Sequence, residues 1–173
     1  MQLLLILVSL AALIWVAYED LRYRAVTWWC FPILFLLLSA QAWQNNPWQE
    51  WFQMLLMNIG FVSIQLALVS LYFSFKHRKF ILLTNGFIGL GDILFFLCFC
   101  GAMATPFFVA FYITSLIGSL LLAVFISSIR KNGIPLAGLQ ALFLIIVLLY
   151  SYVQGFSLTD ESVWFIIIQD LVL

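Results

Sequence analysis

Two aspartates in an otherwise apolar chain are the residues best suited to chemistry. Asp20 follows a first apolar segment, and Asp92 ends the run Gly-Leu-Gly-Asp at residues 89–92, directly before another apolar segment. An ionisable side chain at or inside a bilayer is costly, so it indicates a functional site by default. When two carboxyl groups come close, the ionised one can activate a water while its protonated partner polarises a carbonyl. Asp20 and Asp92 would then do the chemistry of an aspartic protease.

Two glycines are expected to shape the backbone beside Asp92. Without Cβ atoms, Gly89 and Gly91 allow unusual backbone conformations and let an extended peptide approach closely. Irregular backbone at membrane depth is tolerated only where it is buried in protein or faces a watery cavity. The structural alternative is that Asp92 caps the helix that follows it and that Asp20 is a solvated residue with Arg24 at i+4.

The composition indicates a membrane protein. Hydrophobic residues make up 66% of the 173 positions and charged residues only 8%, whereas a soluble domain carries roughly 25% charged residues. No Pro/Ser-rich or charge-rich stretch divides the chain, so residues 1–173 are predicted to form a single membrane-embedded domain. The chain has no stripe of basic residues that would bind nucleic acid, so no nucleic-acid partner is expected. The cysteines lack the paired spacing of a zinc site, so we expect no metal, disulfide framework or cofactor.

Six apolar segments would hold the two aspartates, and most approach the roughly 20 residues that cross a bilayer. They cover residues 2–18, 26–43, 51–75, 92–104, 106–129 and 136–153. The fourth is short, so it either begins earlier or lies partly sunk among its neighbours. All seven Lys and Arg residues fall in the connectors after the first, third and fifth segments. The positive-inside rule therefore predicts six transmembrane helices with the N-terminus outside, and Asp20 and Asp92 share the cytoplasmic face.

Other aromatic and polar residues are expected to serve the packing of the bundle. Asn58 is expected to make interhelical hydrogen bonds, and Ser115 and Ser119 to lie on a helix-packing face of small residues. Glu19 adjoins Asp20 but projects about 100° away from it on a helix, so we expect it to be solvated rather than catalytic. The tryptophans near segment ends are typical of the aromatic belt at a membrane interface: Trp28, Trp29, Trp43, Trp48 and Trp51.

The surroundings of the two aspartates resemble the motifs of type IV prepilin peptidases. Residues 20–26, Asp-Leu-Arg-Tyr-Arg-Ala-Val, are similar to the family's first motif, an Asp followed by basic residues at the second and fourth positions and a branched apolar residue at the sixth. Residues 89–92 are similar to the G-x-G-D motif that names this group of aspartyl proteases. Ile134-Pro135 resembles the start of the family's Ile-Pro-Phe-Gly-Pro sequence. The likeness covers nearly the whole chain in the number, order and orientation of segments.

The resemblance implies a leader peptidase of the inner, or cytoplasmic, membrane. Such an enzyme cuts the leader of a pilin-like or other membrane precursor, a protein with a leader and an apolar helix, at the cytoplasmic face. Asp20 and Asp92 would be its catalytic carboxyl groups, with Gly89 and Gly91 shaping the backbone beside the substrate. The zinc-binding insertion of bifunctional members is absent, so N-methyltransferase activity is not expected. The resemblance sets no oligomeric state.

The sequence departs from the family pattern at three places. Residues 26–28, Val-Thr-Trp, stand where the family has Ile-Pro-Asn, and Leu94 stands where it has Lys. Residues 134–138 read Ile-Pro-Leu-Ala-Gly. These departures, Thr27, Trp28 and Leu94 among them, bear on specificity and activity. Two alternatives stay open: a presenilin-like intramembrane protease, which shares G-x-G-D, and a small transporter or non-catalytic membrane scaffold that uses the carboxyl groups to bind ions or a partner.

Overall fold

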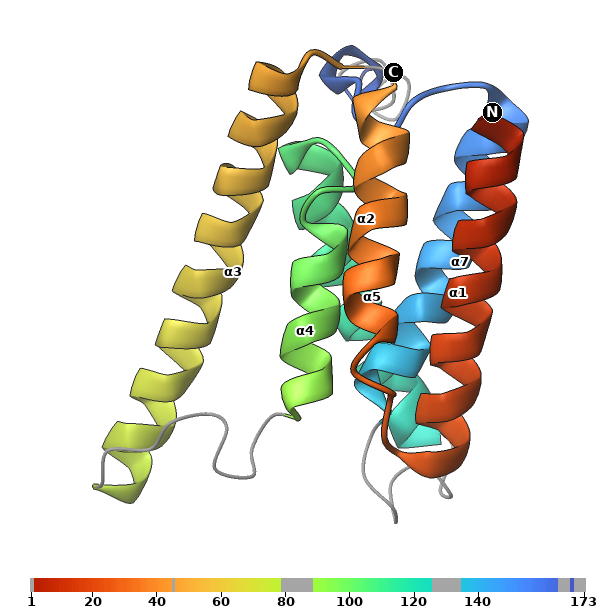
Figure 1. Cartoon of the computed structure of the whole chain (residues 1–173). Helices are drawn as coiled ribbons and strands as arrows, with labels where there is room; N and C mark the ends of the chain where they lie inside the picture. The colour runs from red at the N-terminus through yellow and green to blue at the C-terminus, as the bar shows by residue number, and fades with distance from the viewer. Residues whose placement is uncertain (1, 45, 79–88, 126–134, 165–168, 170–173) are drawn as a thin grey trace.

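The described part of the chain is helical throughout its regular elements. A computed structural model describes residues 2–44, 46–78, 89–125, 135–164 and 169. The helices are α1 (Gln2–Tyr23), α2 (Cys30–Trp43), α3 (Trp48–His77), α4 (Leu90–Phe99), α5 (Thr105–Phe125) and α7 (Leu136–Gln154). They lie side by side in one bundle and alternate in direction along the chain (Figure 1). The prediction of an all-α fold is confirmed for these residues.

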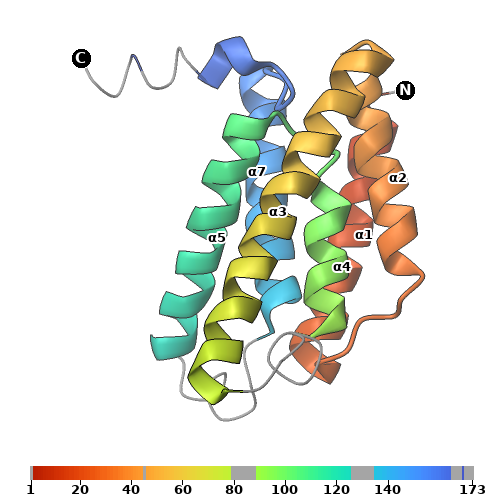
Figure 2. The same cartoon turned by 90° about the vertical axis from the view of Figure 1, so that its left-hand side faces the viewer.

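The apolar helices differ widely in length. Among the described residues α1, α3, α5 and α7 are each long and apolar enough to cross a membrane, whereas α2 and α4 are shorter. α4 has 10 residues, so it is only about 15 Å long, half the hydrocarbon thickness of a typical bilayer. The chain is therefore a membrane protein in which one apolar helix, α4, is much shorter than a bilayer span and lies inside the bundle in contact with α2, α3 and α7 (Figure 2).

The C-terminal end of α4 is sunk among its neighbours. The turn that follows, residues 100–104, is buried at all of its positions. The indole of Trp51 donates to the carbonyl of Gly101 over 3.0 Å. The amide of Asn58 donates to two further carbonyls of this turn, over 2.8 and 3.0 Å. Because protein groups satisfy the irregular backbone, α4 can end at this depth.

Residues after α7 cover this sunken end. The backbone N–H of Ala104 donates to the carbonyl of Leu158 over 2.9 Å. The ring of Phe107 lies 6.1 Å from that of Phe156 and 5.2 Å from that of Trp164, measured between ring centres. Backbone and aromatic contacts therefore hold the residues after α7 against the end of the bundle that lies away from Asp20 and Asp92.

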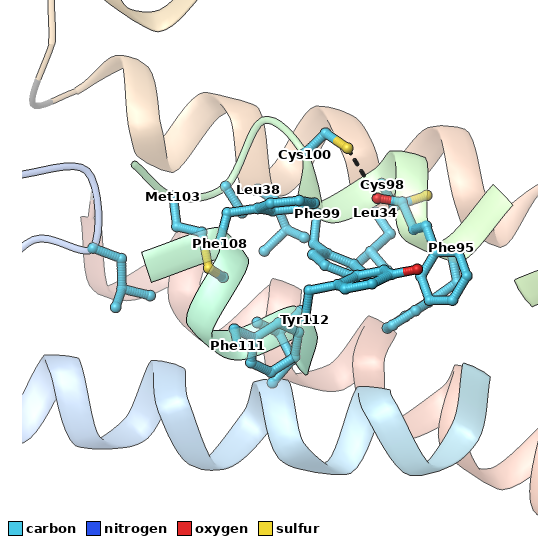
Figure 3. Packing of buried hydrophobic residues seen from close by; sticks show 14 of the residues in the cluster. Leu34, Leu38, Phe95, Cys98, Phe99, Cys100, Met103, Phe108, Phe111 and Tyr112 are labelled. Carbon is cyan, nitrogen blue, oxygen red and sulfur yellow. Dashed lines mark hydrogen bonds between the residues drawn. The ribbon is translucent and has the colours of Figure 1, made fainter. Parts of the chain in front are cut away.

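Aromatic side chains hold α4 against α5. The ring centre of Phe99 lies 5.2 Å from those of both Phe108 and Phe111, and Phe96 lies 5.1 Å from Tyr112. Figure 3 shows the rings of Phe99, Phe108, Phe111 and Tyr112 gathered with the buried leucines of α2, Leu34 and Leu38. Aromatic pairs of this spacing add to the free energy of burial. This packing fixes the position of α4 and, with it, the start of the helix that carries Asp92.

Three details differ from the sequence prediction. The second apolar segment is predicted from residue 26, but α2 begins at Cys30, because residues 24–27 form a non-helical connector. The fourth is predicted over residues 92–104, whereas α4 ends at Phe99. Trp51 does not belong to an aromatic belt, since it is only 4% exposed and its N–H serves the buried turn. The other four tryptophans assigned to the belt are exposed: Trp28, Trp29, Trp43 and Trp48.

The described basic residues gather at one end of the bundle. Arg22 and Arg24 stand at the end of α1, and Lys76 and Arg78 at the end of α3, which lies at the same end (Figure 1). This is also the end at which α4 begins. The remaining basic residues, Lys79, Arg130 and Lys131, lie outside the described residues.

Candidate active site

Asp20 lies inside the bundle rather than in a solvated connector. α1 continues past the predicted limit of residue 18 to Tyr23, so Asp20 occupies its last turns. The side chain is 7% exposed, and its Oδ2 accepts the backbone N–H of Gly138 over 2.6 Å. The interpretation of Asp20 as a solvated residue is therefore wrong, because α7 buries and binds its carboxyl group.

Gly138 permits this contact because it has no side chain. A Cβ on Gly138 would lie 3.0 Å from the Cβ of Asp20 and 3.3 Å from the carbonyl oxygen of Ala17. The second of these neighbours is backbone of α1 and cannot move without the helix. α1 and α7 also form the most extensive helix contact among the described residues. The close approach of the two helices thus depends on glycine at position 138.

The carboxyl group of Asp92 makes one contact at the start of its own helix and a second contact with α7. It lies in the first turn of α4, where the backbone N–H of Gly89 donates to its carboxyl group. Its Oδ1 also accepts the backbone N–H of Ala137 over 3.0 Å. Asp92 therefore caps α4, as the structural alternative proposes, and at the same time reaches the start of α7.

The two aspartates bind consecutive backbone amides of α7. Adjacent backbone nitrogens are separated by three covalent bonds, about 4 Å at most, so hydrogen bonds of 3.0 and 2.6 Å place the accepted oxygens within about 10 Å of each other. The charges of the two carboxyl groups repel each other, whereas the charge of Arg24 attracts the carboxylate of Asp20. The first N–H groups of a helix lack partners within it and favour negative charge. The N-terminus of α7 is therefore the element that gathers the pair.

Both carboxyl groups line one cleft. Its volume is about 430 Å³, within the range of roughly 300–1,000 Å³ typical of ligand pockets. Residues 24–26 form one wall and residues 89–91 another, and Pro135 and Ala137 complete the lining. No group of three or more His, Cys, Asp or Glu side chains that could hold a metal ion occurs in the described part of the chain. The arrangement suits chemistry carried out by two carboxyl groups and a water.

The two glycines before Asp92 matter for the room that their missing side chains leave, and neither has an unusual backbone conformation. Neither Gly89 nor Gly91 has a positive φ, and Gly89 is extended with φ −66° and ψ 141°. The expectation of a conformation that only glycine adopts is therefore wrong. A Cβ on Gly89 would lie 3.1 Å from Oδ2 of Asp92, whereas one on Gly91 would meet only Phe31 at an ordinary 3.7 Å. Gly89 thus leaves room for the carboxyl group, and Gly91 is part of the cleft lining.

The positions that depart from the family pattern have different surroundings. Val26 lines the cleft. Thr27 donates its N–H and its hydroxyl to the carboxylate of Glu19, over 2.8 and 2.9 Å, so Glu19 is bound to protein rather than simply solvated. Trp28 is 59% exposed, and Leu94 is 38% exposed and lies outside the cleft. Of these four positions only Val26 lines the cleft, and in the third departing stretch Ala137 lines it as well.

The amides of α7 are the functional feature that the sequence motifs do not identify. The motifs single out Pro135 but assign no role to Ala137 and Gly138. Proline is favoured where a helix begins, and a glycine shortly after it allows close approach of another element. Those two signals together could have indicated the start of α7 as a binding element.

The likeness of this chain to a known family is a resemblance in short motifs. Among the residues that carry the resemblance to type IV prepilin peptidases, Asp20, residues 24–26, residues 89–92 and Pro135 line the cleft. The resemblance therefore rests on these residues and on the order of the helices. In comparisons with protein-family models, curated proteins and solved structures, nothing matches this chain.

Proposed function

We propose that this chain is a membrane aspartyl endopeptidase that acts as a leader peptidase. One observation carries the proposal: Asp20 and Asp92, distant in sequence, share a cleft and bind consecutive amides at the start of α7. A buried or half-buried pair of carboxyl groups is costly in an apolar bundle, so a pair held open to a cavity favours a chemical role. The resemblance to prepilin peptidases supports the same reaction.

Each carboxyl group keeps one oxygen on α7 and has a second oxygen for the reaction. The ionised member takes a proton from water, whose oxygen attacks the carbonyl carbon of the scissile peptide bond. The protonated member donates its proton to the carbonyl oxygen. The C–N bond of the tetrahedral intermediate then breaks as the first carboxyl group passes the proton it took from water to the leaving nitrogen. The second carboxylate takes a proton from a hydroxyl of the intermediate, which forms the carbonyl of the new C-terminus and restores the pair. The pair titrates as a unit, so the acid and base roles belong to Asp20 and Asp92 together.

The proposed topology has six transmembrane helices, an outer N-terminus and the cleft at the cytoplasmic side of the inner membrane. Every described basic residue lies at the cleft end of the bundle, as the positive-inside rule requires for a cytoplasmic face. The short helices α2 and α4 count among the six. The substrate would be a precursor whose leader reaches the cleft from the cytoplasm while its apolar helix stays in the bilayer.

Co-expression with a panel of leader-bearing membrane precursors tests this function. N-terminal sequencing of the products should show a new terminus with the native chain and the uncut precursor with Asp20→Asn or Asp92→Asn. Full cleavage by either variant would refute the two-aspartate mechanism. Precursors that co-purify with the native chain but remain uncut would instead support a non-catalytic scaffold.

A further inference from the structure

Two adjacent acidic residues of α1 hold different parts of the site. Asp20 turns toward α7 and accepts the N–H of Gly138. Glu19 turns toward the connector between α1 and α2, where Oε2 accepts the N–H of Thr27 over 2.8 Å and Oε1 accepts the Thr27 hydroxyl over 2.9 Å. One carboxylate therefore grips both donors of a single residue. We call this pair of hydrogen bonds the Glu19–Thr27 clasp.

The clasp closes the segment that forms one wall of the cleft. Residues 24–26 line the cleft and lie between the two clasped positions. At the start of this segment, Arg24 adopts a left-handed conformation with φ 57°, and its N–H donates to the carbonyl of Asp20 over 3.0 Å. At its end, Thr27 accepts the N–H of Cys30 over 3.0 Å in the turn that opens α2. The wall is thus fixed at both ends, by backbone at Arg24 and by Glu19 at Thr27.

Packing alone does little to hold this wall. Arg24 and Ala25 are exposed, and Val26 is only partly buried. Hydrogen bonds to an ionised acceptor are shorter and stronger than bonds between neutral groups. The clasp therefore adds two charge-assisted hydrogen bonds at the end of a segment that has few buried contacts.

We infer that Glu19 is a positioning residue that acts through Thr27 to set the width of the cleft. This inference rests on the proposed peptidase function and deepens it. The other wall, residues 89–91, belongs to the start of α4, whose later residues Phe95, Phe96 and Phe99 are buried in the core of the bundle. A fixed separation between the two walls would pre-organise the cleft for an extended peptide, which lowers the cost of binding. The inference also gives Thr27 a role at a position where the family pattern has Pro.

Cleavage kinetics on a precursor identified by co-expression test the role in binding. Glu19→Ala removes the clasp, and we expect KM to rise about tenfold while kcat changes less than about twofold, the pattern of lost binding shared by ground and transition states. Thr27→Val should show part of this rise in KM, whereas Thr27→Ser, which keeps the hydroxyl, should have the KM and kcat of the native chain. Glu50→Gln, at an exposed carboxylate on α3, is the matched control. A fall in kcat at unchanged KM would overturn the inference.

A distance measurement across the cleft tests the clasp without proteolysis. Nitroxide labels at Ala25 and Leu90, on opposite walls, should give one narrow distance distribution by pulsed electron paramagnetic resonance. Glu19→Ala should broaden this distribution, and Thr27→Ser should not. If the native chain cuts no precursor but the distribution still broadens, the peptidase function fails while the clasp stands. An unchanged distribution in a folded Glu19→Ala variant, with thermal unfolding as the check on folding, would overturn the inference.

Discussion

The two ends of α4 use buried polar groups in opposite ways. At the sealed end, residues 100–104, the neutral donors of Trp51 and Asn58 satisfy backbone carbonyls in a turn whose residues are all buried. At the cleft end, Asp20 and Asp92 accept backbone amides of α7 but also line a cavity. Ten residues of helix separate a polar site that is closed from one that is open.

The difference lies in what remains after the internal hydrogen bonds are made. A neutral donor at the sealed end makes hydrogen bonds to carbonyls that would otherwise be unsatisfied. Its removal therefore leaves buried carbonyls without a partner, which lowers the stability of the fold. A carboxyl group at the cleft end keeps lone pairs and a titratable proton directed to a cavity. Substitutions at the sealed end should therefore change stability, and substitutions at the cleft end should change chemistry.

The largest expected effect is at the cleft end. Asp20→Asn or Asp92→Asn should lower the rate of precursor cleavage by a factor on the order of 10²–10⁴ or more, because an amide cannot transfer the proton. The amide oxygen still accepts the N–H of α7, so thermal unfolding should stay close to that of the native chain. Cleavage assays and unfolding curves on the same preparations measure both. A variant that unfolds early would show that the carboxylates hold the fold, which would erase the contrast between the two ends.

The sealed end should give the largest loss of stability. Asn58→Ala leaves two buried carbonyls without their donor, and we expect the free energy of unfolding to fall by about 2–4 kcal/mol. KM and kcat of the remaining folded protein should be unchanged. Gln53→Ala, an exposed amide on the same helix, is the control and should have little effect. Reversible unfolding in detergent measures the difference, and equal losses at both positions would show that the buried turn does not depend on Asn58.

Sequence patterns predicted the helical class and the end of the bundle at which both aspartates lie, because hydrophobicity and charge are local properties. They also predicted the interhelical role of Asn58, which is confirmed by its bonds to the turn after α4. The sequence does not decide whether the short fourth segment begins earlier or lies sunk among its neighbours, because the depth of α4 depends on donors that come from α3. The burial of Trp51 was missed for the same reason.

The gathering of the aspartates was only partly predictable. A shared depth in the membrane followed from charge, but the binding of both side chains by α7 depends on which backbone amides face the cleft. Nothing in the types of residues 137 and 138 encodes an amide donor, because every residue except proline carries one. The Glu19–Thr27 clasp was hidden in the same way: the helical projection correctly turned Glu19 away from Asp20, but it gave no information on the connector that folds back to meet it.

Gly138 links the two kinds of effect, because it lies at the cleft end but acts by packing. Gly138→Ala should push α1 from α7, lower the free energy of unfolding by about 1–3 kcal/mol and weaken cleavage by displacing Asp20. The matched control is Gly60→Ala on α3, where an added Cβ meets nothing within 4 Å and where alanine should stabilise the helix by roughly 0.5–1 kcal/mol. Unfolding curves and cleavage assays on the same preparations measure both effects. A Gly138→Ala variant with native activity would show that the close approach of α1 is dispensable.

The smallest effect is expected for a buried hydroxyl group that belongs to neither end of α4. Ser119 is fully buried on α5, and its hydroxyl has no hydrogen-bond partner among the described residues. Ser119→Ala should therefore change the free energy of unfolding by less than about 0.5 kcal/mol, because no bond is lost. Ser115, one turn away, donates to the carbonyl of Tyr112 and accepts the amide of Gln140, so Ser115→Ala should cost about 1 kcal/mol. Parallel unfolding of the two variants measures the contrast. A loss above about 1 kcal/mol for Ser119→Ala would mean that its hydroxyl is bonded, for example to an internal water.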